Sequence, residues 1–208
     1  MDFLFSLNRK IADRIFVPLF MRTPLRPNHI TILSLLSGIA AAAFIAHGSR
    51  PDLLTGAFLL QLSFILDNCD GTVARLKSMR SAFGMWLDLI ADLFVDFSLW
   101  AALATAAIFY EGVDPWLILP ALIGALAGSI INFLRVVRKK LKGQTGKEVP
   151  RARNAFFSAI HVLGHDGDPT IFIWILAAVA TPAQFLFAGL FYIYAIWIAD
   201  TLQAKASA

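Results

Sequence analysis

The most informative stretch of this sequence is residues 67–92, which read DNCDGTVARLKSMRSAFGMWLDLIAD. Asp67 and Asp70 are spaced i, i+3, so both lie on one face of a helix. Asp88 and Asp92 are spaced i, i+4 and share a helix face in the same way. A short polar turn lies between the two pairs. We therefore expect two antiparallel helices, joined by that turn, whose four carboxylates converge at one depth.

The rest of the chain is apolar enough for a lipid bilayer. Of its 208 residues, 58% are hydrophobic and only 15% are charged, and the mean hydropathy is +0.70. A soluble domain of this size lacks the interior volume to bury so much apolar surface. A carboxylate inside an apolar membrane segment costs about 2.5–3.5 kcal/mol on insertion scales, so a cluster of them indicates a function.

We expect an all-α fold, a polytopic membrane helix bundle of about six transmembrane helices with an N-terminal interfacial amphipathic helix. The chain is expected to be a single domain over residues 1–208, with a cytosolic interfacial helix and lead-in at 1–28 and the bundle at 29–208. A span needs about 20 apolar residues. The expected spans are residues 30–46, 53–73, 83–110, 115–137 and two short helices within 170–199, separated at Thr181-Pro182. A single kinked span over 170–199 is the alternative, and would give five spans.

The first 21 residues favour a helix lying in the membrane interface. Charged residues occupy the other side of its helical wheel. The apolar residues at helical spacing are Phe3, Leu4, Leu7, Ile11, Ile15 and Leu19. An ordinary amphipathic helix packed on protein is an equally good interpretation.

The distribution of basic residues predicts the orientation. With six spans, 17 of the 18 Lys and Arg residues fall on one side and only Arg50 on the other. The positive-inside rule makes the basic side cytoplasmic. The protein is thus expected to be integral to a bacterial or archaeal inner membrane, with the Asp cluster at its cytoplasmic side.

The chemistry expected of the cluster is metal binding. Four carboxylates in a low-dielectric setting need cations to neutralise them, and oxygen-only ligands suit Mg²⁺ or Mn²⁺. Two divalent ions match the four negative charges, and such a pair is the usual clamp for displacement at phosphorus. Gly71, Ala74 and Gly84 leave a groove for a ligand beside the carboxylates. Arg75 is placed to hold a diphosphate through paired hydrogen bonds.

The pattern D-x₂-D-G-x₂-A-R-x₈-G-x₃-D-x₃-D over residues 67–92 resembles the complete signature of the CDP-alcohol phosphatidyltransferases. The sequence from Pro27 to Thr31, leading into the first span, is also similar to this family. The resemblance implies attack by an acceptor hydroxyl on the phosphorus of a CDP-activated alcohol, usually CDP-diacylglycerol, with release of CMP. It also implies a homodimer, because members of this family are commonly homodimers.

The resemblance also implies roles for individual residues. Asp67, Asp70, Asp88 and Asp92 are similar to the family's metal ligands, and Asp92 is similar to its proton acceptor. The residues that resemble contacts to the CDP-lipid are Asn28, Thr31, Gly71, Arg75 and Ser81. Ala74 and Gly84 line the expected groove.

The acceptor is expected to carry a phosphate, as inositol phosphate and glycerol phosphate do. Basic residues near the cytosolic end of the fourth span and beyond it suggest this; they include Arg135, Arg138, Lys139 and Arg153. The alternative is that they only follow the positive-inside rule and attract anionic lipid, at roughly 1 kcal/mol per charge.

Two rival functions remain open at this point. The CDP could be carried by choline or ethanolamine, with diacylglycerol as the acceptor. Alternatively, the chain could be a transporter or channel, although transporters place their sites at the midplane between repeated halves and this sequence has no internal repeat. The expected partners are a CDP-activated lipid, a polar alcohol and membrane lipids, and no nucleic acid.

Three residues that are not fixed positions of the signature have structural interpretations. Asp96 is expected to make a buried hydrogen bond, and Cys69 is expected to pack against a neighbouring helix. Gly124 begins a small-xxx-small pair that allows close helix packing, within the bundle or across a dimer.

Overall fold

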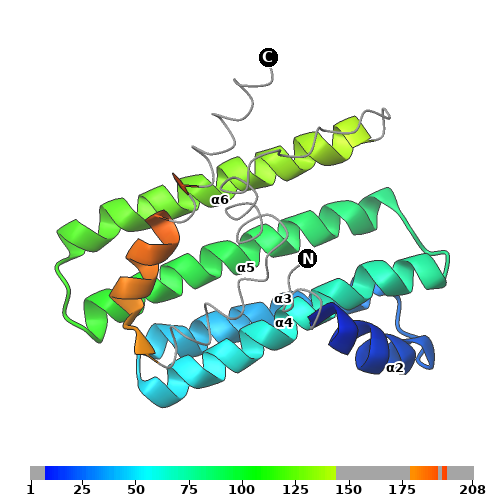
Figure 1. The fold of residues 1–208 in the computed structure, drawn as a ribbon, viewed down its shortest axis with the longest axis horizontal. Coiled ribbons are helices and arrows are strands. Elements are labelled where there is room, and N and C mark those ends of the chain that lie inside the picture. The colour runs from blue at the N-terminus through cyan, green and yellow to red at the C-terminus, as the bar shows by residue number, and fades with distance from the viewer. Residues whose placement is uncertain (1–7, 144–178, 192–193, 196–208) are drawn as a thin grey trace, which may run out of the picture.

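The computed structural model describes residues 8–143, 179–191 and 194–195, and all regular structure among these residues is helical (Figure 1). The elements are η1 Ala12–Phe16, α2 Val17–Met21, α3 Pro27–His47, α4 Arg50–Leu76, α5 Ala82–Phe109 and α6 Pro115–Gly143. A further short helix covers Pro182–Phe191. The predicted all-α class is therefore confirmed, and the first four expected spans correspond to α3, α4, α5 and α6.

Three of the described helices are long and apolar enough to cross a membrane: α3, α5 and the Pro115–Arg138 part of α6. α4 is long but carries Arg50, Asp52, Asp67, Asp70 and Arg75. These charges make α4 less apolar than the other three helices, so it is not among those apolar enough to cross a membrane. Much of the expected last stretch, residues 170–199, lies outside the described residues, so the count of six spans stays a prediction.

Local capping chemistry sets the helix starts. The Ser81 hydroxyl accepts a hydrogen bond from the Gly84 N–H at 2.9 Å and caps α5. Asp114 Oδ1 accepts from the Trp116 N–H at 2.9 Å at the start of α6. Thr181 caps the short helix, because its hydroxyl accepts from the Gln184 N–H at 3.4 Å. The expected break at Thr181-Pro182 is thus present.

α3 packs closely against both α4 and α5, whereas the backbones of α4 and α5 hardly approach each other. A Cβ on Gly38 of α3 would lie only 2.5 Å from a Val95 methyl of α5. A Cβ on Gly56 of α4 would lie 2.5 Å from Ile45 of α3. The turn after α4 joins it to α5, and α3 packs against both helices.

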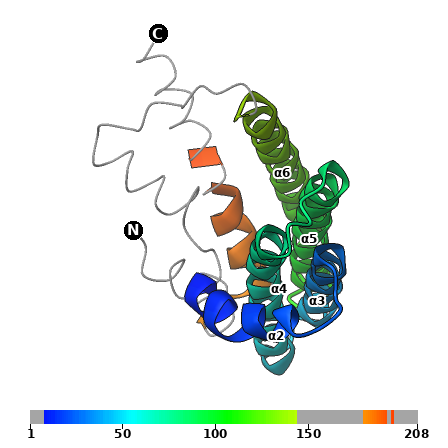
Figure 2. The ribbon, with the colours of Figure 1, turned by 90° about the vertical axis from the view of Figure 1, so that its right-hand side faces the viewer.

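The N-terminal segment, residues 8–25 with η1 and α2, lies across the side of α4 (Figure 2). Ala12, Val17 and Phe20 are buried in one apolar cluster with Cys69 and Val73 of α4. The expected packing of Cys69 against a neighbouring helix is thus present. On the other side of the segment, Ile15 is 60% and Leu19 is 55% exposed. The segment therefore packs on protein, as an ordinary amphipathic helix would. It also exposes apolar side chains, as an interfacial helix would, and its contact with the membrane stays a prediction.

Polar contacts hold the same segment to α4 at both ends. Gln61 Nε2 donates a hydrogen bond to Oδ1 of the buried Asn8. The Lys77 ammonium donates three hydrogen bonds to main-chain carbonyls of the segment: to Phe20 at 3.1 Å, Thr23 at 3.0 Å and Leu25 at 2.8 Å. All three ammonium donors therefore have an acceptor, and the end of the segment is attached to the last turn of α4.

The opposite end of the bundle is held by contacts to the short helix. Arg50 donates to the Ala180 carbonyl at 2.7 Å. The Glu111 carboxylate accepts from the Ala183 N–H at 3.3 Å. A Cβ on Gly124 of α6 would lie 2.8 Å from Leu190, so Gly124 is used for close packing within the bundle.

The Lys77 attachment predicts a defined loss of stability. We expect Lys77→Ala to lower the free energy of unfolding by about 2 kcal/mol, since hydrogen bonds from charged groups contribute about 1.5–3 kcal/mol. Thermal unfolding in detergent and protease cleavage of the N-terminal segment measure this. The control is Arg80→Ala, because Arg80 is an exposed cation in the connection between α4 and α5. Equal unfolding midpoints and cleavage rates for the two variants would contradict the attachment.

Candidate active site

The structure brings three of the four signature carboxylates into one cluster. One oxygen each from Asp67, Asp70 and Asp88 lies within 4.8 Å of the others. Asp67 and Asp70 come from α4, and Asp88 reaches the cluster from α5. α4 and α5 therefore meet at this cluster through side chains rather than through close backbone contact.

Asp92 lies one helical turn beyond Asp88 and is exposed. Its charge acts on Asp67, together with the charges of Asp88 and Asp70. It is outside the group of three mutually close carboxylates. Asp92 is therefore placed beside the cluster.

The donor set fits a hard divalent cation. All three side chains offer carboxylate oxygens, which Mg²⁺ and Mn²⁺ prefer. Two oxygens on opposite sides of one Mg²⁺ are about 4.2 Å apart, twice the usual bond length. The 4.8 Å spread of these oxygens is close to that separation, so small side-chain movements suffice for coordination.

Asp70 is oriented by a residue of α3. It is 6% exposed, and it accepts a hydrogen bond from the hydroxyl of Thr31, which is 3% exposed. The resemblance implied a CDP-lipid contact for Thr31, whereas its side-chain contact in the structure is with Asp70 and, at 3.3 Å, the Pro27 carbonyl. Thr31 is thus placed to fix the direction of a cluster carboxylate.

A hollow of about 240 Å³ opens beside the cluster. Its lining residues are Arg9, Asp67, Asn68, Asp70, Gly71, Thr72, Arg75 and Asp88. A Cβ on Gly71 would meet only Arg75 Nη1, at 3.9 Å. The absence of a side chain at Gly71 therefore leaves room in the hollow for another molecule.

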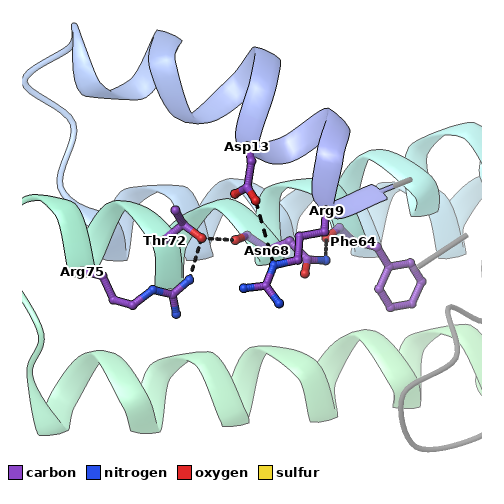
Figure 3. Close-up of polar contacts among 6 residues, drawn as sticks. All are labelled: Arg9, Asp13, Phe64, Asn68, Thr72 and Arg75. Carbon is purple, nitrogen blue, oxygen red and sulfur yellow. Dashed lines mark hydrogen bonds and ion pairs between the residues drawn. The ribbon is translucent and has the colours of Figure 1, made fainter. Parts of the chain in front are cut away.

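Arg75 and Arg9 are the two cations of this lining (Figure 3). Arg75 Nη2 donates to the Thr72 hydroxyl at 2.7 Å, and that hydroxyl donates to the Asn68 carbonyl at 3.3 Å. The sequence predicted Arg75, but not Arg9, Asn68 or Thr72. Only the packing of the N-terminal segment on α4 identifies Arg9 as a residue of this site.

The other predicted CDP contacts lie outside the lining. Asn28, Ser81 and Gly84 come together where α3 and α5 begin, because a Cβ on Gly84 would lie 3.0 Å from Asn28 Oδ1 and 3.1 Å from Ser81 Oγ. Ala74 is half-buried on α4. Their contacts with a CDP-lipid stay predictions.

The predicted acceptor residues are only partly described. Arg135 is half-buried and Arg138 is exposed. They lie near the end of α6, at the same end of the bundle as the turn between α4 and α5 (Figure 1). The side chain of Lys139 and the whole of Arg153 lie outside the described residues.

Asp96 belongs to a separate polar group. Its carboxylate is hydrogen-bonded to Ser129 of α6, and Ser129 also accepts from the Trp100 indole N–H at 3.1 Å. The expected structural role of Asp96 is therefore supported.

Comparison of the sequence and the fold with known proteins identifies a family and several similar proteins. Residues 25–185 match the family model for CDP-alcohol phosphatidyltransferases. A bifunctional IPC transferase and DIPP synthase of Aquifex aeolicus is 36% identical over 126 residues, which are 61% of this chain and 27% of that protein. The chain thus spans about a quarter of the length of that relative.

One further relative and one solved structure match over most of their length. A phosphatidylinositol phosphate synthase of Corynebacterium glutamicum is 27% identical over 82% of this chain and 80% of its own. The fold is similar to a crystal structure of Mycobacterium tuberculosis phosphatidylinositol phosphate synthase with CDP-DAG bound. That likeness has a TM-score of 0.53 and 22% identity, and covers 87% of this chain and 94% of the other.

The Thr31 contact predicts a loss of metal affinity. We expect Thr31→Val to weaken Mn²⁺ binding by about 10–100-fold, as is typical when the partner of a metal ligand is removed. Thr31→Ser, which keeps the hydroxyl, is expected to restore most of the affinity. Calorimetric titration of the purified protein measures both. Wild-type affinity in Thr31→Val would show that Asp70 needs no such partner.

Proposed function

The chain belongs to the CDP-alcohol phosphatidyltransferase family, and from that premise we propose that it transfers a phosphatidyl group from CDP-diacylglycerol to the hydroxyl of a phosphorylated polyol. CMP is the other product. The observation that carries the proposal is the cluster of Asp67, Asp70 and Asp88 beside a hollow lined by Gly71 and Arg75. All of these residues lie within the matched range.

In this proposal, Asp67, Asp70, Asp88 and Asp92 hold two divalent ions, Mg²⁺ or Mn²⁺. When bound, such ions neutralise and polarise a diphosphate. Thr31 keeps Asp70 in its orientation. Arg75 binds the diphosphate, and Gly71, with Ala74, keeps the groove open for the CDP moiety. Asn28, Ser81 and Gly84 complete the contacts at the start of α3 and α5.

Asp92 is proposed as the general base. The acceptor hydroxyl loses its proton to this carboxylate as its oxygen forms the new bond to phosphorus. The bond between that phosphorus and the bridging oxygen of CMP breaks, and CMP leaves with the electron pair. The exposure of Asp92 beside the buried Asp70 supports this division of roles, because the acceptor has to reach the base from the aqueous side.

We propose inositol phosphate as the acceptor and glycerol phosphate as the second candidate. The name of the Corynebacterium glutamicum relative describes a product that combines a phosphatidyl group with an inositol phosphate. Arg135, Arg138, Lys139 and Arg153 are the proposed contacts to the acceptor phosphate. The guanidinium groups among them suit paired hydrogen bonds to phosphate oxygens.

The membrane setting is the last part of the proposal. The family and the three long apolar helices indicate an integral membrane protein. We propose six spans, an active site on the cytoplasmic side of a bacterial or archaeal inner membrane, and a homodimer. Ile15 and Leu19, which point outward from the N-terminal segment, are proposed to contact the membrane interface.

The function is tested by CMP release from the purified full chain in lipid nanodiscs with Mg²⁺ or Mn²⁺. CDP-diacylglycerol is combined in turn with inositol phosphate, glycerol phosphate and unphosphorylated inositol, and the lipid product is identified by mass. A second arm combines CDP-choline or CDP-ethanolamine with diacylglycerol. CMP release only in the second arm, or ion flux in liposomes without CMP release in either arm, would overturn the proposal.

The general base predicts a separation of binding from turnover. Asp92→Asn is expected to bind CDP-diacylglycerol while its kcat falls by about 10²–10⁴-fold, because the amide cannot take the proton. Asp92→Glu is expected to retain a little activity. A near-wild-type kcat in Asp92→Asn would show that another group is the base.

The groove predicts opposite effects for two glycines. Gly71→Ala is expected to leave the folded state at least as stable, since the added Cβ meets only Arg75 Nη1 at 3.9 Å and alanine favours a helix over glycine by up to about 1 kcal/mol. It is expected to raise the KM for CDP-diacylglycerol by about tenfold, because the methyl group occupies the space for the ligand. The matched control is Gly38→Ala, whose Cβ would lie 2.5 Å from Val95 and is expected to lower the unfolding midpoint. An unchanged KM in Gly71→Ala would remove Gly71 from the binding site.

The acceptor contacts predict a change confined to one substrate. Arg135→Ala and Arg153→Ala are each expected to raise the KM for inositol phosphate by about tenfold, the scale of a lost charge-assisted hydrogen bond. The KM for CDP-diacylglycerol is expected to stay the same. Arg22→Ala, an exposed cytosolic cation in the proposed topology, is the control. Unchanged acceptor KM values would leave these cations only their effect on membrane topology.

A further inference from the structure

The N-terminal segment supplies one side chain to the hollow, and that side chain is Arg9. It lies outside residues 25–185, the range that matches the family model. In Figure 3 the Arg9 side chain extends from this segment toward Asn68 of α4, and Arg75 lies further along the same helix. The hollow therefore has cations from two separate elements on its wall, and carboxylates from α4 and α5.

The position of Arg9 is set by packing. The adjacent Asn8 is 4% exposed and is hydrogen-bonded to Gln61. Ala12, three residues after Arg9, is fully buried against α4. The Lys77 ammonium attaches the other end of the segment. Arg9 is consequently held over the hollow by contacts on both sides.

The contact that Arg9 makes in the structure is one that a ligand can replace. Its Nε lies 3.9 Å from Asp13 Oδ2, and the two side chains are 56% and 46% exposed. Exposed ion pairs of this kind contribute only about 0–1 kcal/mol. Asp13 lies on the π-helical turn Ala12–Phe16, a local geometry often found near functional sites. The pair orients the guanidinium toward the hollow without binding it tightly.

A phosphate oxygen is the ligand that matches these features. A guanidinium prefers carboxylate and phosphate oxygens, to which it donates two hydrogen bonds at once. The carboxylates of this hollow are the proposed metal ligands, so the group that meets Arg9 there belongs to a substrate. Both proposed substrates carry phosphate: CDP-diacylglycerol in its diphosphate and the acceptor in its monoester.

We propose that Arg9 binds a substrate phosphate in this hollow, by exchanging Asp13 for a phosphate oxygen. The proposal rests on the proposed function for the identity of the substrates. It gives the N-terminal segment a role in substrate affinity, in addition to its packing on α4.

The test compares four variants of the full chain in nanodiscs: Arg9→Ala, Arg9→Lys, Asp13→Asn and the control Arg14→Ala. Arg14 is an exposed cation of the same segment that is not among the lining residues. The KM values for CDP-diacylglycerol and for inositol phosphate are measured separately. Binding of CDP in Mg²⁺ without acceptor is titrated by calorimetry and needs no turnover.

Arg9→Ala is expected to raise one of the two KM values by about tenfold, with a smaller change in kcat, because a charge-assisted hydrogen bond is lost. Arg9→Lys is expected to recover part of the affinity, and Asp13→Asn to match or exceed wild-type affinity because a competitor for Arg9 is removed. A rise in the KM for CDP-diacylglycerol, with weaker CDP binding, assigns the diphosphate. A rise in the KM for inositol phosphate alone assigns the acceptor.

The proposal is overturned if Arg9→Ala leaves CDP affinity and both KM values within about twofold of wild type, or if Arg14→Ala has the same effect as Arg9→Ala. Failure of the proposed function has a different signature. In that case the wild-type chain releases no CMP with any acceptor, and the calorimetric CDP titration alone decides whether Arg9 binds a phosphate.

Discussion

Repulsion between carboxylates is the constraint on which the rest of this structure depends. Asp67, Asp70 and Asp88 have oxygens within 4.8 Å of one another, and because these residues are half-buried or buried, their like charges repel more strongly than they would in bulk water. Space for cations and substrate has to remain between the two helices that carry them. α3 packs on both α4 and α5, and the close approaches at Gly38 and Gly56 fix its position against those two helices.

The same helix contributes to the chemistry of the cluster. Thr31 of α3 donates to Asp70, so the helix that packs on both α4 and α5 also orients one of their carboxylates. On the other side of α4, the N-terminal segment packs on Cys69 and Val73 and brings Arg9 to the hollow. α4 is thus the centre of the site: one side carries Asp67 and Asp70, and an adjacent side receives the N-terminal segment.

Helix positions and the Asp cluster were predictable from sequence because both depend on local pattern. Apolar runs, Asp114-Pro115 and Thr181-Pro182 determine where helices begin, and i, i+3 and i, i+4 spacing places carboxylates on one face. The packing of α3 on both α4 and α5 depends on which helices have small residues at which depth, and no local pattern reports this. Arg9 could not be assigned for the same reason, since its sequence neighbours indicate only an amphipathic helix. Asp67, Asp70 and Asp88, rather than all four carboxylates, form the tightest group, which helical spacing alone does not predict.

Asp67, Asp70 and Asp88 are proposed to form a divalent-metal site. Titration of Mn²⁺ into the purified full chain, with calorimetric detection, tests this most directly. Wild type is compared with Asp70→Asn and with the control Asp96→Asn. Asp96 lies on α5, but its carboxylate is hydrogen-bonded to Ser129, outside the cluster. We expect saturable Mn²⁺ binding in wild type and in Asp96→Asn, and affinity at least about 100-fold weaker in Asp70→Asn, because a cluster ligand is lost. Equal Mn²⁺ affinity in wild type and Asp70→Asn would contradict it.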